Sequence, residues 1–296
     1  MRLEPFRLHR PASVEAASDL LDEFGTSAVL YCGGTELLLV AKLGFTAFTE
    51  LIDIKAIEEL SGIDVPAPAD GGEWELRIGA RTTHRELERS PVVTERLPAL
   101  ARMERNVANP RVRNAGSIGG NLCFADPHSD PATFLIAAGA SLSIRRGGGA
   151  ARRIAVEEFA PGPYRTLLEP GELLVAVHVP APAPGSAIAH RKMSFHERPA
   201  VTVAIRVTVR DGAVADARAA VASVGLRAHR LFGAEQALVG LDAGDPDAEA
   251  LAAVAEAAAG DCEPVADSNG SVEYKRQLVR VLTARCAADA LAGAAG

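Results

Sequence analysis

The sequence predicts an α+β protein with two N-terminal α/β modules, followed by a three-stranded antiparallel sheet and a helical bundle. Strand-like and helix-like runs alternate through residues 1–179, as in α/β modules. The segment PAPAPGS at 180–186 then interrupts the pattern, and three strand-like runs precede three helical runs after it. We therefore expect one domain over 1–179, with submodules of about 1–57 and 58–179, and a second over 180–296.

The composition indicates a globular protein. The 296 residues are 48% hydrophobic, enough for a large core, and the net charge of −7 argues against nucleic acid as a partner. The four cysteines are widely spaced without a CxxC pattern, so neither a metal site nor an iron–sulfur cluster is expected in this chain. The start lacks an apolar signal core and no run is long enough to span a membrane, which favours a cytoplasmic location.

The first module has the signals of a β-α-β unit. Ser13 is placed to cap a helix that Gly25 ends. Residues 28–32 are expected to form a buried strand, 35–43 a helix and 50–54 a second strand.

The second module repeats this mixture on a larger scale. A helix is expected to start in 81–87, with Thr82 or Thr83 near its cap. The other expected elements are strands at 74–78, 141–144, 153–156 and 172–179, and helices at 97–107 and 130–138.

The C-terminal part predicts strands first and helices afterwards. Asp211 and Gly212 form a strong hairpin signal between two of the strands. The expected strands cover 188–195, 200–209 and 214–224, and the expected helices lie near 229–239, 246–259 and 271–289.

Two glycine-rich segments are the main functional signals. The first reads LYCGGTE at 30–36, and the second, within 111–140, places Gly116, Gly119 and Gly120 beside Ser117 and Asn121. Glycines let backbone N–H groups approach a phosphate closely, and a helix start adds positive potential. The alternative for each segment is a tight turn before a helix. Neither segment has the spacing of a Rossmann fingerprint or a P-loop, so the residues themselves indicate a non-Rossmann binder of a dinucleotide or phosphate.

Other polar residues allow two interpretations. Asp126, His128 and Asp130 could imitate a metal site, or could brace a turn, which such short motifs do more often. Arg111 and Arg113 suit either phosphate neutralisation or a subunit contact.

The pair CGGTEL and RVRNAGSIGGNLCFADPHSD resembles the FAD-binding medium subunit of the molybdenum hydroxylase family, of the xanthine dehydrogenase and aerobic carbon monoxide dehydrogenase type. The resemblance covers nearly the whole chain. It implies that 1–179 is a PCMH-type FAD-binding domain and that 180–296 is the family's C-terminal flavoprotein domain.

The resemblance also implies which residues bind FAD. Asp130 matches a carboxylate that helps to hold the flavin end, and Cys123 and Val107 match positions near the cofactor. Leu174 and Lys192 match positions that reach the flavin ring; Lys192 would tune the flavin, unless it is a surface lysine at a strand end. The matching positions are Leu30, Tyr31, Cys32, Gly33, Gly34, Thr35, Glu36, Val107, Ser117, Ile118, Gly119, Gly120, Asn121, Cys123, Asp130, Leu174 and Lys192.

The implied function is electron transfer through FAD, without a catalytic acid or base in this chain. Electrons would come from [2Fe-2S] clusters of a small subunit, beside a large subunit with molybdopterin, and would leave to NAD, a quinone or dioxygen. A dimer of heterotrimers is implied, and whether His196 or Arg198 meets the acceptor stays open. The alternatives are a stand-alone flavin-dependent oxidoreductase and a cofactor-free scaffold subunit.

Overall fold

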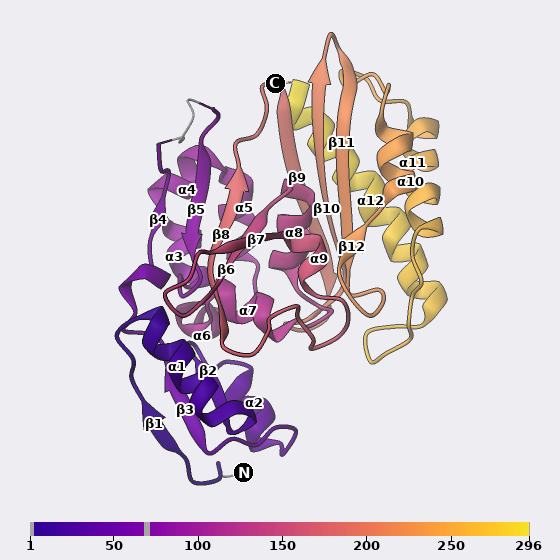
Figure 1. Cartoon of the computed structure of the whole chain (residues 1–296). Helices are drawn as coiled ribbons and strands as arrows, with labels where there is room; N and C mark the ends of the chain where they lie inside the picture. Colours follow the sequence, from indigo (N-terminus) through magenta and orange to yellow (C-terminus); the bar gives the residue numbers. More distant parts are fainter. Residues whose placement is uncertain (1–2, 68–71, 296) are drawn as a thin grey trace. The chain divides into compact units, whose positions relative to one another are not determined.

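The computed structural model describes residues 3–67 and 72–295, which divide into two compact units (Figure 1). Each unit is assembled from several stretches of chain. The first comprises the residues up to 124 with 141–159 and 165–178, and the second comprises 125–140, 160–164 and the residues from 179 onward. The segment 125–140 thus belongs to the same unit as the C-terminal sheet, which a single division at residue 180 does not capture.

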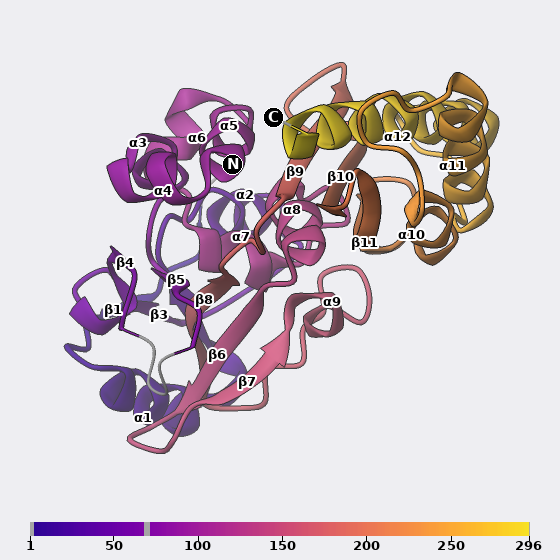
Figure 2. The ribbon, with the colours of Figure 1, turned by 90° about the horizontal axis from the view of Figure 1, so that it is seen from above.

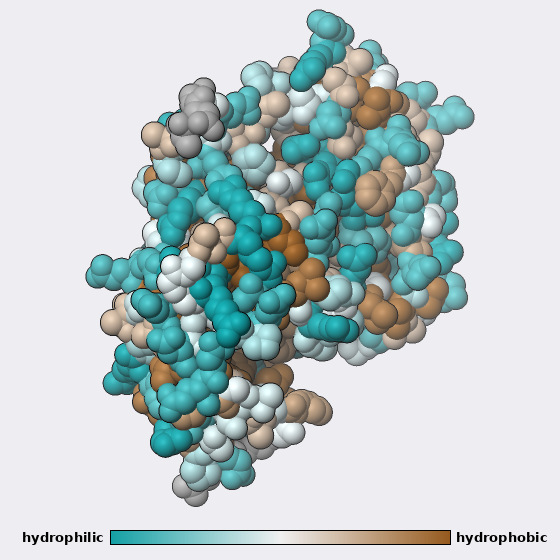
Figure 3. Space-filling view, in the orientation of Figure 1, coloured by the Kyte–Doolittle hydropathy of each residue, from teal (hydrophilic) through white to brown (hydrophobic). Residues whose placement is uncertain are grey.

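The first unit begins with a small parallel sheet in the order β1-β3-β2, formed by β1 (Arg7–His9), β2 (Ala28–Tyr31) and β3 (Glu50–Asp53). Helix α1 (Val14–Phe24) starts where Ser13 accepts a hydrogen bond from the Ala16 N–H, and ends at Gly25, as expected. Helix α2 (Leu37–Lys42) starts two residues later than expected. Apolar side chains reach the surface at α2 and in the loop after it (Figure 3), namely Leu39, Leu43 and Phe45.

The larger sheet of this unit has the order β4-β5-β8-β6-β7. Its strands are β4 (Ile63–Asp64), β5 (Glu75–Gly79), β6 (Ser141–Arg146), β7 (Arg152–Ala155) and β8 (Glu172–Pro180). The helices are α3 (His84–Arg89), α4 (Pro91–Arg96), α5 (Pro98–Arg105), α6 (Pro110–Ala115), α7 (Ile118–Phe124) and α9 (Val156–Phe159), with two 3₁₀ turns at Gly25–Ser27 and Glu58–Leu60. Thr83 caps α3 through a reciprocal capping box with Glu86.

The second unit contains an antiparallel sheet in the order β12-β11-β10-β9. Its strands are β9 (Ser186–Ser194), β10 (Pro199–Arg210), β11 (Ala213–Ala222) and β12 (His229–Arg230). The three expected strands are therefore confirmed, and the two-residue strand β12 adds a fourth strand to the sheet. Asp211 and Gly212, both with positive φ, form the expected hairpin turn. The helices are α8 (Asp130–Ala138), α10 (Phe232–Leu238), α11 (Ala248–Gly260) and α12 (Val272–Ala295).

The sheet of the second unit is covered on both faces (Figure 2). Alternate residues of β10, such as Val203 and Ile205, pack with α12 residues such as Val279 in the main core. The residues between them face α8, where Arg206 Nη1 donates to the Ala138 carbonyl at 3.4 Å. The two-residue period of the strand therefore divides its side chains between two helical layers.

Candidate functional site

The two glycine segments meet inside the first unit. Gly33 lies so close to the Ala115 carbonyl that any Cβ would collide with it, and a Cβ on Gly116 would lie 3.4 Å from Thr35 Oγ1. A side-chain hydrogen bond between Cys32 and Ser117 joins the same segments. The sequence separates these loops widely, and the fold brings them together.

The first segment forms an open turn. Gly34 has φ of +67°, and a Cβ there would collide with the Tyr31 ring, so only glycine fits this turn. The backbone N–H groups of Gly33, Gly34 and Thr35 donate to no acceptor in the part of the chain that the structure describes. Lys55 Nζ lies 3.9 Å from the centre of the Tyr31 ring. This turn therefore offers unpaired N–H donors next to a cation.

The second segment is helical, and the expectation of a loop with exposed N–H groups is wrong here. Ser117 caps helix α7, and the first four N–H groups of the helix are all used within the protein. Their acceptors are the Thr82 carbonyl for Ile118 (2.9 Å), the Ala80 carbonyl for Gly119 (2.8 Å), Ser117 Oγ for Gly120 (3.1 Å) and the Ser117 carbonyl for Asn121 (2.9 Å). The first turn of α7 itself therefore leaves no free N–H group for a phosphate.

Gly119 serves packing. A Cβ at this position would lie 2.6 Å from the Ala80 carbonyl oxygen, so α7 approaches the segment after β5 only without a side chain here. Arg81 stands between the two acceptor residues Ala80 and Thr82, and its Nε is buried without a hydrogen-bond partner in the described chain. Sequence reasoning did not single out Arg81, because nothing in RTTH distinguishes it from a surface arginine.

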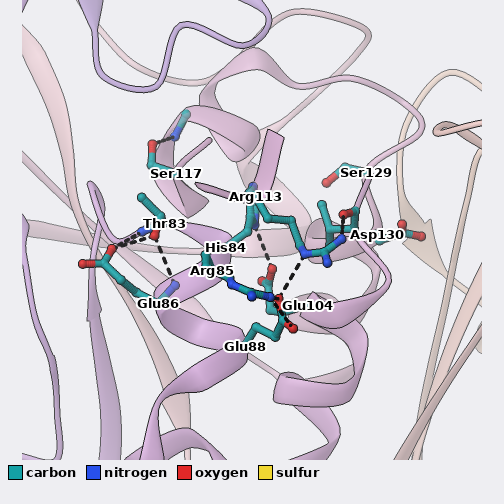
Figure 4. A network of polar contacts seen from close by, with 12 residues as sticks. Thr83, His84, Arg85, Glu86, Glu88, Glu104, Arg113, Ser117, Ser129 and Asp130 are labelled. Carbon is teal, nitrogen blue, oxygen red and sulfur yellow. Dashed lines mark hydrogen bonds and ion pairs between the residues drawn. The ribbon is translucent and has the colours of Figure 1, made fainter. Parts of the chain in front are cut away.

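A buried polar network supports the second segment from below (Figure 4). The His84 N–H donates to the Gly116 carbonyl at 3.0 Å, and His84 Nδ1 lies 2.8 Å from Glu104 Oε2. His84 is 3% exposed and Glu104 is fully buried, so this pair ties α3 to α5 in the interior. His84 is the first residue of α3, directly after its cap Thr83.

Arg113 belongs to the same network. Its Nε donates to Glu88 Oε2 at 3.1 Å and its Nη1 to the Val107 carbonyl at 2.9 Å. Arg113 is 7% exposed and its charge is already paired with Glu88, which argues against a role in phosphate neutralisation or a subunit contact for this residue. Arg111, on the same short helix, is exposed.

Asp130 and Lys192, both predicted site residues, form an ion pair in the second unit. Lys192 Nζ donates to Asp130 Oδ2 at 2.7 Å, and His190 Nε2 lies 3.6 Å from the other carboxylate oxygen. Burial alone would raise the pKa of Asp130, but His190 and Lys192 hold it below its usual range. Lys192 is therefore a fixed, partly neutralised cation.

The remaining predicted residues are internal. Val107 and Leu174 are 6% and 5% exposed, and the Val175 carbonyl next to Leu174 accepts the Ala80 N–H at 2.9 Å. Burial raises the pKa of the Cys123 thiol to about 12, and burial also raises that of Cys32 against the opposing effect of Ser117. Both thiols, which are partly buried, are thus protonated at neutral pH.

Asp126 and His128 brace the turn before α8. Asp126 Oδ1 accepts the His128 N–H and lies near its Nδ1, both at 2.9 Å, which is the bracing that the short motif suggested. Arg198 Nε donates to Asp126 Oδ2 at 2.8 Å, and His196 beside it in the chain is exposed.

Comparison with known proteins agrees with this arrangement. The family model described as "FAD binding domain in molybdopterin dehydrogenase" matches residues 4–182, and "CO dehydrogenase flavoprotein C-terminal domain" matches 188–290. The chain belongs to the family of FAD-binding medium subunits of molybdenum hydroxylases, and the α+β fold class that we predicted is confirmed.

Individual relatives are oxidoreductase subunits. The carbon monoxide dehydrogenase medium chain of Hydrogenophaga pseudoflava is 35% identical, over 95% of each chain. The putative xanthine dehydrogenase FAD-binding subunit of Escherichia coli K12 is 29% identical, over 97% of each. A solved carbon monoxide dehydrogenase from H. pseudoflava superposes with a TM-score of 0.91 over 99% of both chains, at 35% identity.

None of the helices in the two described stretches has the length and apolar character to cross a membrane.

Proposed function

We propose that this chain is the FAD-carrying electron-transfer subunit of a molybdenum hydroxylase complex. The observation that carries the proposal is the meeting of the two glycine segments inside a domain that matches the FAD-binding family model. The bound flavin would supply the conversion between one-electron and two-electron transfer. Electrons would reach it from [2Fe-2S] clusters of a partner and leave to NAD, a quinone or dioxygen.

The chemistry of the donors supports FAD as the ligand. The unpaired N–H groups of Gly33, Gly34 and Thr35 suit an anionic pyrophosphate, and the hydroxyl of Thr35 faces Gly116 of the second segment. The Nε of Arg81, which has no partner in the described chain, is a further donor that an anionic group could use. Residues 30–36, 117–121, Val107, Cys123 and Leu174 stay our proposed binding set.

In the second unit, Asp130 and Lys192 complete the proposed set. An ammonium near the ring would stabilise the negative charge of a reduced flavin, and the ion pair with Asp130 would hold that ammonium in one place. No residue of this chain is required to act as a general acid or base.

The partners in this proposal are a large subunit with molybdopterin and a small subunit with [2Fe-2S] clusters, in a cytoplasmic dimer of heterotrimers. The names of several relatives support a complex of several subunits, because these relatives are medium chains or subunits of dehydrogenases and of a hydroxylase. The domain boundary near residue 180 is supported by the two family models, which meet between 182 and 188.

The first test is an absorption spectrum of the purified chain, with the released chromophore identified by mass. Flavin bands and release of FAD are the expected result. A colourless chain that also takes up no added FAD would contradict the proposal and favour a scaffold subunit. Molybdenum and iron in the complex purified through this chain would favour an electron-transfer subunit over a stand-alone flavoenzyme.

A further inference from the structure

Arg81 has no counter-charge in the first unit. Its side chain makes no hydrogen bond or ion pair with any residue that the structure describes, and its Nε is buried. A guanidinium carries five donors and stays charged at any physiological pH. Arg81 is half-buried, so part of its side chain meets water, but its Nε has neither water nor a described acceptor and remains available to an external one.

The backbone places Arg81 at the junction of the two glycine segments. Its neighbours Ala80 and Thr82 accept the N–H groups of Gly119 and Ile118, which start helix α7. Arg81 also acts electrostatically on the Cys32 thiol, next to Gly33 of the first segment. The backbone of Arg81 therefore lies at the start of α7, and its charge acts on the first segment at Cys32.

The other cations near this junction already have partners. Lys55 pairs with Asp53 at 3.0 Å and lies against the Tyr31 ring, and Arg113 pairs with Glu88. The first four N–H groups of α7 are also used within the protein. An anion held between the segments would therefore find its positive charge chiefly on Arg81.

We infer that Arg81 binds the pyrophosphate of FAD, and that it makes the phosphate contacts that the N–H groups of α7 do not make. This inference rests on the proposed function and adds a binding residue outside the glycine segments. Arginine suits the role because its planar fork donates two parallel hydrogen bonds to phosphate oxygens.

The test compares Arg81→Gln with the unchanged full-length chain in two titrations, one with FAD and one with riboflavin, which lacks the pyrophosphate. Binding is followed by quenching of flavin fluorescence. Loss of a charge-assisted contact is expected to weaken FAD binding on the order of 10- to 100-fold. Riboflavin binding is expected to stay unchanged, and Arg81→Lys is expected to restore part of the FAD affinity as a single point charge.

Arg77 provides a matched control on strand β5. Its guanidinium already donates to the Glu59 carbonyl at 2.8 Å and to Asp64 at 3.3 Å, so Arg77→Gln removes an equal charge that has partners. This variant is expected to bind FAD as the unchanged chain does.

The outcomes separate the inference from the proposed function. Equal FAD affinity in Arg81→Gln, or an equal loss for FAD and riboflavin, overturns the role of Arg81 while the FAD function stands. An unchanged chain that binds no FAD overturns the proposed function, and this inference with it.

Discussion

At the scale of single residues, the stability of the fold is sensitive to substitution in the Asp130–Lys192 ion pair. The Asp130 side chain is 5% exposed and that of Lys192 is 15% exposed, so water solvates neither group well. A buried carboxylate is tolerated because a cation and hydrogen bonds replace water. Removing Lys192 leaves Asp130 with only His190 nearby to offset the cost of its burial.

We therefore expect Lys192→Met to lower the free energy of unfolding by about 3 kcal/mol, the lower end for buried pairs, because Lys192 keeps some exposure. Denaturant unfolding measures this change. The double variant with Asp130→Asn is expected to lose less than the sum of the two single variants. Strict additivity would show that the two side chains do not stabilise each other.

The sequence predicted some of these individual residues and missed others. The resemblance identified both Asp130 and Lys192 as site residues. It did not show that they pair with each other, because the contact of α8 with β9 that brings them together depends on the tertiary fold. Arg81 was missed because its signal is a buried atom without a partner, which depends on tertiary packing.

At the scale of elements, helix α7 depends on the absence of a side chain at Gly119. The helix begins where Ala80 and Thr82 accept its first two N–H groups, so its position is set by the backbone of the segment after β5. Any added carbon must push these two backbones apart.

Gly119→Ala is expected to destabilise the chain by about 1–3 kcal/mol, the usual cost of overpacking. Gly260→Ala is the matched control, because a Cβ there meets nothing within 4 Å and φ is not positive. That substitution is expected to be neutral or to stabilise by up to about 1 kcal/mol. Thermal unfolding of both variants gives the comparison, and similar midpoints would contradict the packing role of Gly119.

Local signals predicted most elements of this chain. Helix α8 has the bounds that were expected, because Ser129 caps it and Gly139 ends it in a left-handed conformation. Helix α7 was taken for a loop because paired glycines usually mark turns, and only tertiary hydrogen bonds keep them helical. Helices α4 and α6 were missed because each has only six residues, too few for a periodic apolar pattern to appear.

At the scale of the whole second unit, charged side chains join three distant segments. His128 Nε2 lies 3.3 Å from Asp267 Oδ2, and the buried Lys275 donates to the same oxygen at 2.8 Å. Asp126 completes the row on the other side of His128, with Arg198 beyond it. The turn before α8 is thereby tied to the start of α12.

The hydrogen bond to Asp126 raises the pKa of His128 against the effect of burial, and Asp267 adds to the rise. A folded pKa above the unfolded value near 6.5 stabilises the fold below that pH, and this contribution is lost as pH rises through the folded pKa. The stability that the unchanged chain has over His128→Gln is therefore expected to be larger at acidic than at alkaline pH. Urea unfolding across this range measures it; a constant difference would show that protonation of His128 does not contribute.

The position of helix α8 in the sequence also determines when the second unit can fold during translation. The ribosome makes this helix, which is almost wholly buried in the finished chain, well before strands β10 and β11 that cover it. Helix α12, which closes the opposite face of the same sheet, is made last. The nascent chain must therefore carry an apolar helix without a partner through much of translation, a state that attracts chaperones and favours aggregation. The first unit interrupts the second in the sequence, so the second can mature only near the release of the chain.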